Sequence, residues 1–143
     1  MKDKFLIDTS IFVYAFDETE PVKRAKCKEF IENVLYNESV YISNQIFAEL
    51  YYVLTKIMRT PIKEEDAQSI VKGFNDSVNW KKINYTHLTV LRAMYLSKSF
   101  QVDFWDSLIA ATMIENNVFT VVTENEKDFR KIPMLKVVNP MKG

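Results

Sequence analysis

Short apolar runs alternate along the chain with longer stretches of helical periodicity. The runs are rich in β-branched residues and bounded by polar ones, which is typical of buried strands. They cover residues 5–8, 40–43, a weak run around Ile83, 118–123 and 136–138. This alternation predicts an α/β fold, with about five mostly parallel strands flanked by helices on both faces and a single domain over residues 1–143.

The stretches between the runs carry helix signals at their ends. Pro21 fits the first turn of a helix that reaches about Tyr36, and Tyr85-Thr86 precedes another. Further helices are expected from Asn44 to before Arg59, from about Lys63 to Asp76, and from the N-cap candidate Asp103 to about Asn117. The last of these is apolar on almost every side over residues 104–114, which indicates a helix buried in the middle of the fold.

Three acidic residues interrupt these apolar patterns. Asp8 closes the first strand, Glu49 flanks an apolar helical stripe, and Asp106 lies within the buried helix. Each also has a simple structural interpretation: Asp8 caps a helix starting near Ile11, Glu49 is a solvated rim residue, and Asp106 interacts with the helix N-terminus. No Lys or Arg occurs between residues 98 and 127, so a local salt bridge to Asp106 is not expected.

Asp8 and the start of the helix that carries Glu49 both lie at the carboxyl edge of the predicted sheet, where open α/β sheets bind ligands. Carboxylates gathered there repel one another and raise each other's pKa values unless a cation bridges them. The chain has one histidine, His87, and one cysteine, Cys27, which argues against a zinc site. Oxygen ligands favour Mg²⁺ or Mn²⁺ and hence phosphoryl chemistry.

The composition limits which folds, partners and cellular locations are expected for this chain. The scarcity of glycine (2) and proline (4) among 143 residues, 48% of them hydrophobic, favours one helix-rich globular unit. With a formal net charge of zero, the chain lacks the overall cationic field that proteins binding nucleic acid non-specifically usually carry, so any such binding must use a local patch or a metal. A single cysteine, with no signal peptide or long apolar span, predicts a cytoplasmic protein with no membrane association.

Four segments, in this order, resemble the motifs of PIN-domain ribonucleases and, among these, the VapC-like toxins of type II toxin–antitoxin systems. The segments are residues 6–10, 42–49, 104–111 and 122–129, and the resemblance extends from Leu6 to about Pro140. It implies a PIN-like domain with Mg/Mn-dependent endoribonuclease activity, in which Asp8, Glu49 and Asp106 are catalytic acids and metal ligands. It also implies an RNA substrate and an antitoxin partner.

The chain departs from this family at a fourth acid that PIN-like enzymes often carry. The matching residue is Asn125. Either a one-residue shift makes Glu124 the fourth metal ligand, or Asn125 contributes a carbonyl or a water-mediated contact. Asp128 is expected to cap or brace the following loop rather than to bind metal. Thr9 and Ser10 are expected either to orient Asp8 or to be turn residues.

The resulting hypothesis is that the acids hold one or two cations, which activate a water for in-line attack on phosphorus. The resemblance implies products with a 5′-phosphate and a 3′-hydroxyl. Candidate RNA contacts are Lys56, Arg59, Lys81, Lys82 and Arg92, although scattered basic residues usually belong to solvated faces. Trp80 and Tyr85 are candidates for stacking on bases, but packing or interface roles are the more common use of such aromatic residues. Tyr51, Tyr52 and Met58 mark either simple packing or a surface for an antitoxin or for the second copy of an expected homodimer.

Two other classes of function stay open. A non-catalytic RNA- or protein-binding module would explain Asn125 in place of an acid. A phosphoryl-accepting signalling domain would use Asp8 as acceptor, but the lysine expected after a strand in such domains is not evident. Lys26 and Lys28 could lower the pKa of Cys27, although an inert thiol is the simpler expectation.

Overall fold

A computed structural model describes residues 3–142 of the chain. Its five strands are β1 (Phe5–Ile7), β2 (Val40–Ser43), β3 (Lys81–Ile83), β4 (Thr120–Val122) and β5 (Lys136–Val138). They form one sheet in the order β3-β2-β1-β4-β5, and all four neighbouring pairs are parallel. The predicted parallel sheet is therefore confirmed, with β4 beginning two residues later than expected.

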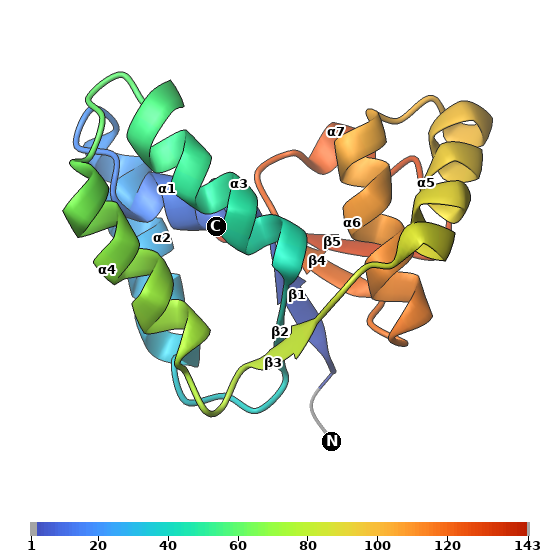
Figure 1. The fold of residues 1–143 in the computed structure, drawn as a ribbon, viewed down its shortest axis with the longest axis horizontal. Helices are drawn as coiled ribbons and strands as arrows, with labels where there is room; N and C mark the ends of the chain where they lie inside the picture. The colour runs from blue at the N-terminus through green and yellow to red at the C-terminus, as the bar shows by residue number, and fades with distance from the viewer. Residues whose placement is uncertain (1–2, 143) are drawn as a thin grey trace.

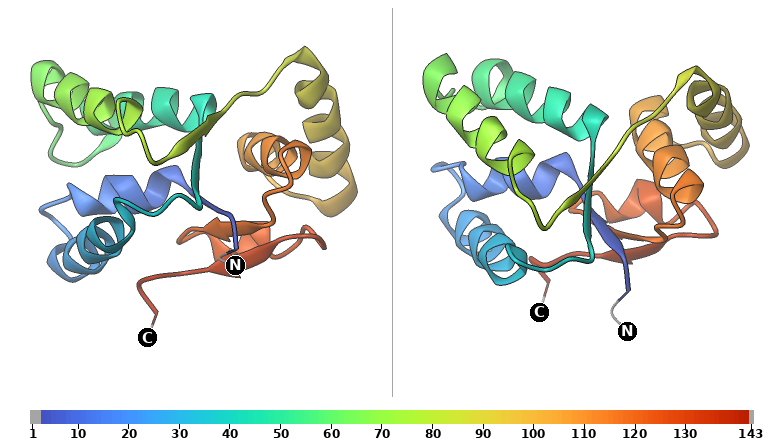
Figure 2. Two further views of the ribbon diagram at one scale, coloured as in Figure 1. Left: turned by 90° about the horizontal axis from the view of Figure 1, so that it is seen from below. Right: turned by 60° about the horizontal axis from the view of Figure 1, so that its bottom comes forward.

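The helices divide into two groups. Between β1 and β3 lie α1 (Thr9–Ala15), α2 (Pro21–Val34), α3 (Asn44–Tyr52), the π-helical turn η1 (Val53–Ile57) and α4 (Glu64–Asn75). After β3 come α5 (His87–Phe100), α6 (Phe104–Glu115) and α7 (Glu126–Phe129). Figure 1 shows α1–α4 on one side of the sheet and α5–α7 on the other, and Figure 2 shows the same division from two further directions, which confirms the two-faced arrangement.

The sheet changes its direction of winding between β1 and β4. The chain proceeds from β1 through β2 to β3 on one side and then returns to β4, which pairs with the other edge of β1. Ile7 and Val122 are partners in this pairing, so Asp8 and Thr123 leave adjacent strands side by side. Such a switch point at the carboxyl ends of the strands is where open α/β sheets bind ligands.

Side-chain caps set the starts of the helices around this edge. The carboxylate of Asp103 accepts hydrogen bonds from the backbone nitrogens of Trp105 and Asp106, which confirms it as the N-cap of α6. Asp8 is the N-cap of α1. The expected start of α1 near Ile11 is therefore wrong by two residues, because the carboxylate of Asp8 accepts from the nitrogen of Thr9 and begins the helix there.

Helix α6 is buried on all sides through its middle, as its apolar pattern predicts, whereas Trp105 in its first turn is exposed. Every residue from 107 to 113 is buried. Ile109 and Met113 belong to the main hydrophobic cluster, which also includes strand residues, whereas Leu108, Ala110 and Ala111 belong to a second cluster that α5 covers. Helix α6 thus packs between two cores, and Asp106 lies in its first turn.

Trp80 and Met58 both lie in the interior. Trp80 is only 2% exposed, stacks on Phe74 and donates from Nε1 to the carbonyl oxygen of Val34, which confirms a packing role and excludes stacking on RNA bases. Met58 is buried in the main core and is therefore excluded from a partner surface.

No helix within residues 3–142 is long and apolar enough to cross a bilayer.

Candidate active site at the carboxyl edge of the sheet

Asp8 is buried at the end of β1, where its carboxylate accepts three hydrogen bonds. Oδ1 accepts from the backbone nitrogen of Thr9 over 2.8 Å, and Oδ2 accepts from the hydroxyls of Ser10 (3.2 Å) and Thr123 (2.7 Å). Burial nevertheless raises the pKa of Asp8, and repulsion from Glu49 adds to the effect. Asp8 thus serves as a helix cap and also lies among other acids, so the two interpretations of this residue do not exclude each other.

Glu49 reaches the same place from the second turn of α3. Its Oε1 accepts from the hydroxyl of Thr9 over 2.7 Å, and its Oε2 accepts from Nε2 of Gln45 over 2.9 Å. Thr9 therefore links the two acids, with its backbone nitrogen on Asp8 and its hydroxyl on Glu49. Glu49 is not a freely solvated rim residue, because both of its carboxylate oxygens are held.

Asp106 approaches from the opposite group of helices. Its Oδ2 accepts a hydrogen bond from Nδ2 of Asn125 over 2.7 Å, and the same amide nitrogen lies 3.1 Å from Oδ2 of Asp128. Asp128 also lies 3.7 Å from the ammonium of Lys131, so it braces this loop as expected. Asn125 in turn donates its backbone nitrogen to the hydroxyl of Thr123, which is bonded to Asp8.

We call Asp8, Glu49 and Asp106 the acid cluster. Burial, followed in order by the negative charges of Asp8, Asp103, Asp128 and Glu49, raises the pKa of Asp106 to about 7. Among residues 3–142, no Lys or Arg forms a salt bridge with any member of the cluster. The cluster is therefore a site of uncompensated negative charge.

Whether a divalent cation fits the acid cluster depends on the type of ligand atoms present and on their arrangement. Within residues 3–142, no group of three Asp, Glu, His or Cys side chains is arranged to hold a metal ion. The carboxylates of Glu49 and Asp106 instead accept from the amides of Gln45 and Asn125. The available donors are all oxygens, and a cation would relieve the repulsion that raises the pKa of Asp106. The chemistry of the acids thus fits Mg²⁺ or Mn²⁺, although the ligand set is not preassembled.

Glu124 lies beside the cluster but is engaged elsewhere. Its Oε2 accepts a hydrogen bond from the ammonium of Lys23 over 2.7 Å, and Lys23 also lies over the ring of Tyr14. Its backbone nitrogen donates to the hydroxyl of Ser10. Of the two residues considered for the fourth position, Asn125 is the one whose side chain contacts the acid cluster.

The candidate RNA contacts have mixed surroundings. Lys56 pairs with Glu64, and Arg92 pairs with Glu115. Lys82 donates to the carbonyl oxygen of Ser77, whereas Arg59 and Lys81 are exposed. Tyr52 is exposed at the end of α3, while Tyr51 packs partly against the main core.

Sequence reasoning did not single out Gln45 or Thr123. Thr123 lies opposite Asp8 at the neighbouring strand end, so a hydroxyl following the fourth apolar run was the available signal. Gln45 is only 5% exposed and lies one turn before Glu49, a spacing that places two helix side chains together. A buried glutamine in the first turn of an amphipathic helix was the signal for its role.

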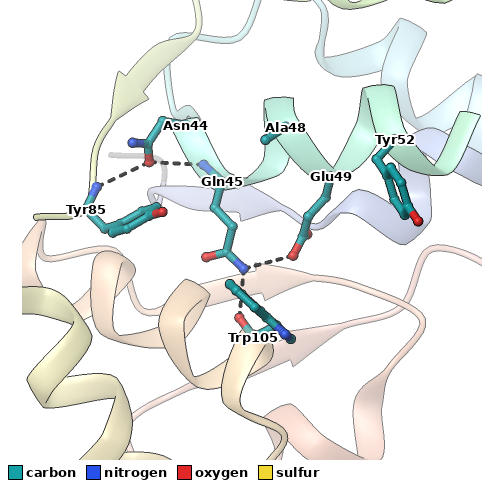
Figure 3. Close-up of a pocket in the computed structure, with 7 residues that line it drawn as sticks. All are labelled: Asn44, Gln45, Ala48, Glu49, Tyr52, Tyr85 and Trp105. Atoms are coloured by element: carbon teal, nitrogen blue, oxygen red, sulfur yellow. Dashed lines mark hydrogen bonds between the residues drawn. The ribbon is translucent and has the colours of Figure 1, made fainter. Parts of the chain in front are cut away.

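A pocket of about 700 Å³ adjoins the acid cluster. It is lined by Asn44, Gln45, Ala48, Glu49, Tyr52, Tyr85 and Trp105 (Figure 3). Nε2 of Gln45 donates to Oε2 of Glu49 and to the carbonyl oxygen of Trp105, both over 2.9 Å. Gln45 thus ties α3 to α6 at the point where the pocket meets the acids.

Comparison with known proteins gives a family and several similar structures. The PIN domain family model matches residues 5–135. VapBC2 from Rickettsia felis, solved bound to a DNA fragment from its promoter, is similar with a TM-score of 0.69 and 27% sequence identity over 94% of this chain and 97% of that chain. A search of curated proteins finds no match.

Two further structures share the fold at lower sequence identity. A toxin–antitoxin complex from Klebsiella pneumoniae has a TM-score of 0.66 and 23% identity, covering 96% of this chain and 98% of that chain. VapC20 from Mycobacterium tuberculosis, a sarcin–ricin loop cleaving toxin, has a TM-score of 0.71 and 14% identity, covering 92% and 97%. These two similarities establish the fold alone.

Proposed function

Because the chain belongs to the PIN domain family, we propose that it is a divalent-metal-dependent endoribonuclease and the toxin of a toxin–antitoxin pair. The observation that carries the proposal is the acid cluster at the switch point of the sheet. Its members come from both groups of helices, lack basic partners among residues 3–142, and include one carboxyl group whose pKa is about 7. Repulsion among these carboxylates destabilises the folded protein, and a bound cation that contacts a phosphate would relieve it.

In the proposed function, Asp8, Glu49 and Asp106 hold the cation. When bound, Mg²⁺ or Mn²⁺ supplies Lewis acidity toward the phosphate and lowers the pKa of a water molecule. Thr9 fixes the spacing of Asp8 and Glu49 because it bonds to both. Ser10 and Thr123 hold the second oxygen of Asp8.

Asn125 takes the fourth position in this proposal, and Glu124 does not act as a metal ligand. The amide of Asn125 orients Asp106, and its carbonyl oxygen is the atom available for a direct or water-mediated contact with the cation. Without a cation, the raised pKa of Asp106 lets its carboxyl group retain a proton near neutral pH. The site would then gain its full negative charge only when the cation displaces that proton.

An antitoxin is the proposed protein partner. The support is the similarity to VapBC2 from Rickettsia felis at 27% identity over almost the whole of both chains. A homodimer remains a prediction from the sequence. The exposed ring of Tyr52, which lies at the edge of the pocket, is available to a partner, whereas Met58 is not.

The test is cleavage of a pool of single-stranded and structured RNA by the purified chain, freed of any antitoxin, with Mg²⁺ or Mn²⁺ or with EDTA. We expect cutting that requires the metal, that Asp8→Asn abolishes, and that Asp76→Asn on the exposed surface leaves intact. Equal cutting by wild type and Asp8→Asn would overturn the assignment.

Asn125 also favours a second candidate function, a binding module without catalysis. This function would account for an amide in the fourth position and for the absence of a preassembled ligand set within residues 3–142. RNA that is retained by the protein but never cut with either metal would support it.

A further inference from the structure

The pocket beside the acid cluster contains a buried polar atom that no neighbour satisfies. Within residues 3–142, Oε1 of Gln45 has no hydrogen-bond partner, and the side chain is only 5% exposed. A buried acceptor without a donor costs free energy, so native structures rarely keep one unless something else binds it. Gln45 lines the pocket, and Figure 3 shows its carbonyl oxygen turned away from Glu49, toward the side where Tyr85 lies.

The orientation of this amide is fixed by its other contacts. Nε2 donates to Oε2 of Glu49 and to the backbone carbonyl oxygen of Trp105, and both of these atoms are acceptors. A flipped amide would bring Oε1 against two acceptors and lose both hydrogen bonds. The group that Gln45 offers to the pocket is therefore an acceptor, and its occupant must supply an N–H or O–H donor.

Three aromatic side chains line the pocket together with Asn44, Ala48 and Glu49. Trp105 is 56% exposed, although it follows the cap of a helix that is otherwise buried, and Tyr52 and Tyr85 also line the pocket. Exposed indole and phenol rings are surfaces on which unpaired bases stack, and each such stack contributes about 1 to 3 kcal/mol in single-stranded nucleic-acid complexes. The volume of about 700 Å³ is ample for one base.

We propose that this pocket binds one unpaired nucleobase of the RNA, next to the phosphate at the acid cluster, and that Gln45 selects bases carrying an exocyclic amine. This inference rests on the proposed function and names its substrate class more narrowly. Glu49 belongs to both the pocket and the cluster, so a nucleotide whose base occupies the pocket has its phosphate within reach of the acids.

The expected order of bases follows from a single fixed acceptor. Adenine, cytosine and guanine each carry an amino group that can donate to Oε1 of Gln45. Uracil has one N–H on its pairing edge, flanked by two carbonyl oxygens, which would approach the same oxygen unfavourably. We therefore expect selection against uracil, with stacking on Trp105 common to all four bases.

The experiment uses the chain's two tryptophans as reporters. A ¹⁵N-resolved NMR spectrum gives one indole N–H signal for each tryptophan. Trp105 lines the pocket and reports on binding there. The indole N–H of Trp80 is buried against Val34, so its signal serves as an internal control. Hexamers of A, C or U, and a hexamer of purine riboside that lacks the amine of adenine, are titrated into wild type in EDTA, so that no cleavage occurs. Trp105→Phe assigns the signal.

We expect the A and C hexamers to shift the Trp105 signal and to bind about five- to tenfold more tightly than the U and purine-riboside hexamers. Gln45→Met keeps the volume and removes the acceptor, together with the Nε2 donor to Glu49 and Trp105. It should bring the ratio close to one while the spectrum stays that of a folded protein. Equal binding of all hexamers by wild type would overturn the role of Gln45.

The NMR titration and the RNA cleavage assay can fail independently of each other. Metal-dependent cleavage without any shift of the Trp105 signal would leave the proposed function standing and overturn the base pocket, which would then be open to a side chain of a protein partner. A selective shift in a protein that cuts no RNA would support the pocket and count against the nuclease.

Discussion

Asn125 donates from Nδ2 to Oδ2 of Asp106 over 2.7 Å, and the same nitrogen lies 3.1 Å from Oδ2 of Asp128. One neutral amide thus holds two carboxylates that would otherwise repel each other. A carboxylate at position 125 could not donate to either, so the residue that departs from the usual PIN pattern also determines how the acids are arranged without a cation.

Asn125→Asp should therefore make the site depend more strongly on metal. A fourth carboxylate adds a ligand and removes the amide that holds Asp106, so we expect Mn²⁺ to bind about tenfold more tightly by calorimetry. Asn125→Ala also removes the amide but adds no ligand, and it should not tighten binding. Unchanged affinity in Asn125→Asp would place residue 125 outside the metal site.

Glu49→Gln and Glu124→Gln form a matched pair for the same measurement. Glu49 contacts Thr9 beside Asp8, whereas Glu124 is paired with Lys23. We expect Glu49→Gln to weaken Mn²⁺ binding at least about tenfold and Glu124→Gln to change it by less than about twofold. The reverse order would make Glu124 the ligand and Glu49 a structural residue.

Asp106 should reduce the stability of the metal-free protein at neutral pH. Folding raises its pKa from 3.8 to about 7, so the folded state binds more protons than the unfolded state between these values. The free energy of unfolding should fall as pH rises from about 4 to about 7. In urea titrations, Asp106→Asn should stabilise the protein at pH 8 by about 1 to 2 kcal/mol, less than the full pKa shift because the carboxyl group is partly solvated, and should have little effect at pH 4.

Asp76→Asn is the control for this measurement. Asp76 is exposed and paired with Lys72, which lowers its pKa, so its substitution should give no gain at pH 8. A stability of wild type that does not change with pH between 4 and 7 would contradict the assigned protonation of Asp106.

The hydroxyl of Thr123 should matter more than that of an ordinary buried threonine. It donates to Oδ2 of Asp8 and accepts from the backbone nitrogen of Asn125. Thr123→Val removes both bonds around a buried carboxylate and should cost about 1 to 3 kcal/mol in chemical denaturation. Thr112→Val, whose hydroxyl bonds only to a carbonyl oxygen of its own helix, should cost less than about 1 kcal/mol. Equal losses would show that the hydroxyl of Thr123 contributes no more than that of Thr112.

Cys27 should be inert. Burial, together with the charge of Glu124, raises the pKa of its thiol to about 11, so the neighbouring lysines in sequence do not activate it. Alkylation by iodoacetamide at pH 8 should be about 100-fold slower in the folded protein than in urea. Comparable rates in the two states would show that the thiol is accessible.

The parts of the fold that were predictable from sequence are those governed by local rules. The apolar pattern on almost every side of the helix predicted that α6 is buried. Residue types that favour N-caps predicted helix starts at Asp103 and Thr86, and the structure confirms both as N-caps. The parallel direction of the strands followed from the alternation of elements, whereas their order in the sheet was not predicted. The π-helical turn after α3 was not predicted, because apolar residues at its positions suit an α-helix equally well.

The interior of the candidate site depended on contacts that no local rule supplies. Thr123 and Asp8 are 115 residues apart and meet only because β1 pairs with β4. Whether Glu124 or Asn125 faced the acids depended on which way a loop turns, and Lys23 on α2 is what draws Glu124 away. Packing was the favoured role for Trp80, but its contacts with Phe74 and Val34 could not be read from the sequence.

The position of helix α6 between two cores constrains how this protein can vary. Seven consecutive buried residues follow directly after Asp106, and they face different hydrophobic clusters on opposite sides. A change of side-chain volume in either cluster shifts the helix and carries the carboxylate with it. Substitutions at Ala110 or Met113 therefore alter the spacing of the acids from a distance, so natural variants of this chain should conserve the summed volume around α6 as strictly as they conserve the charged groups themselves.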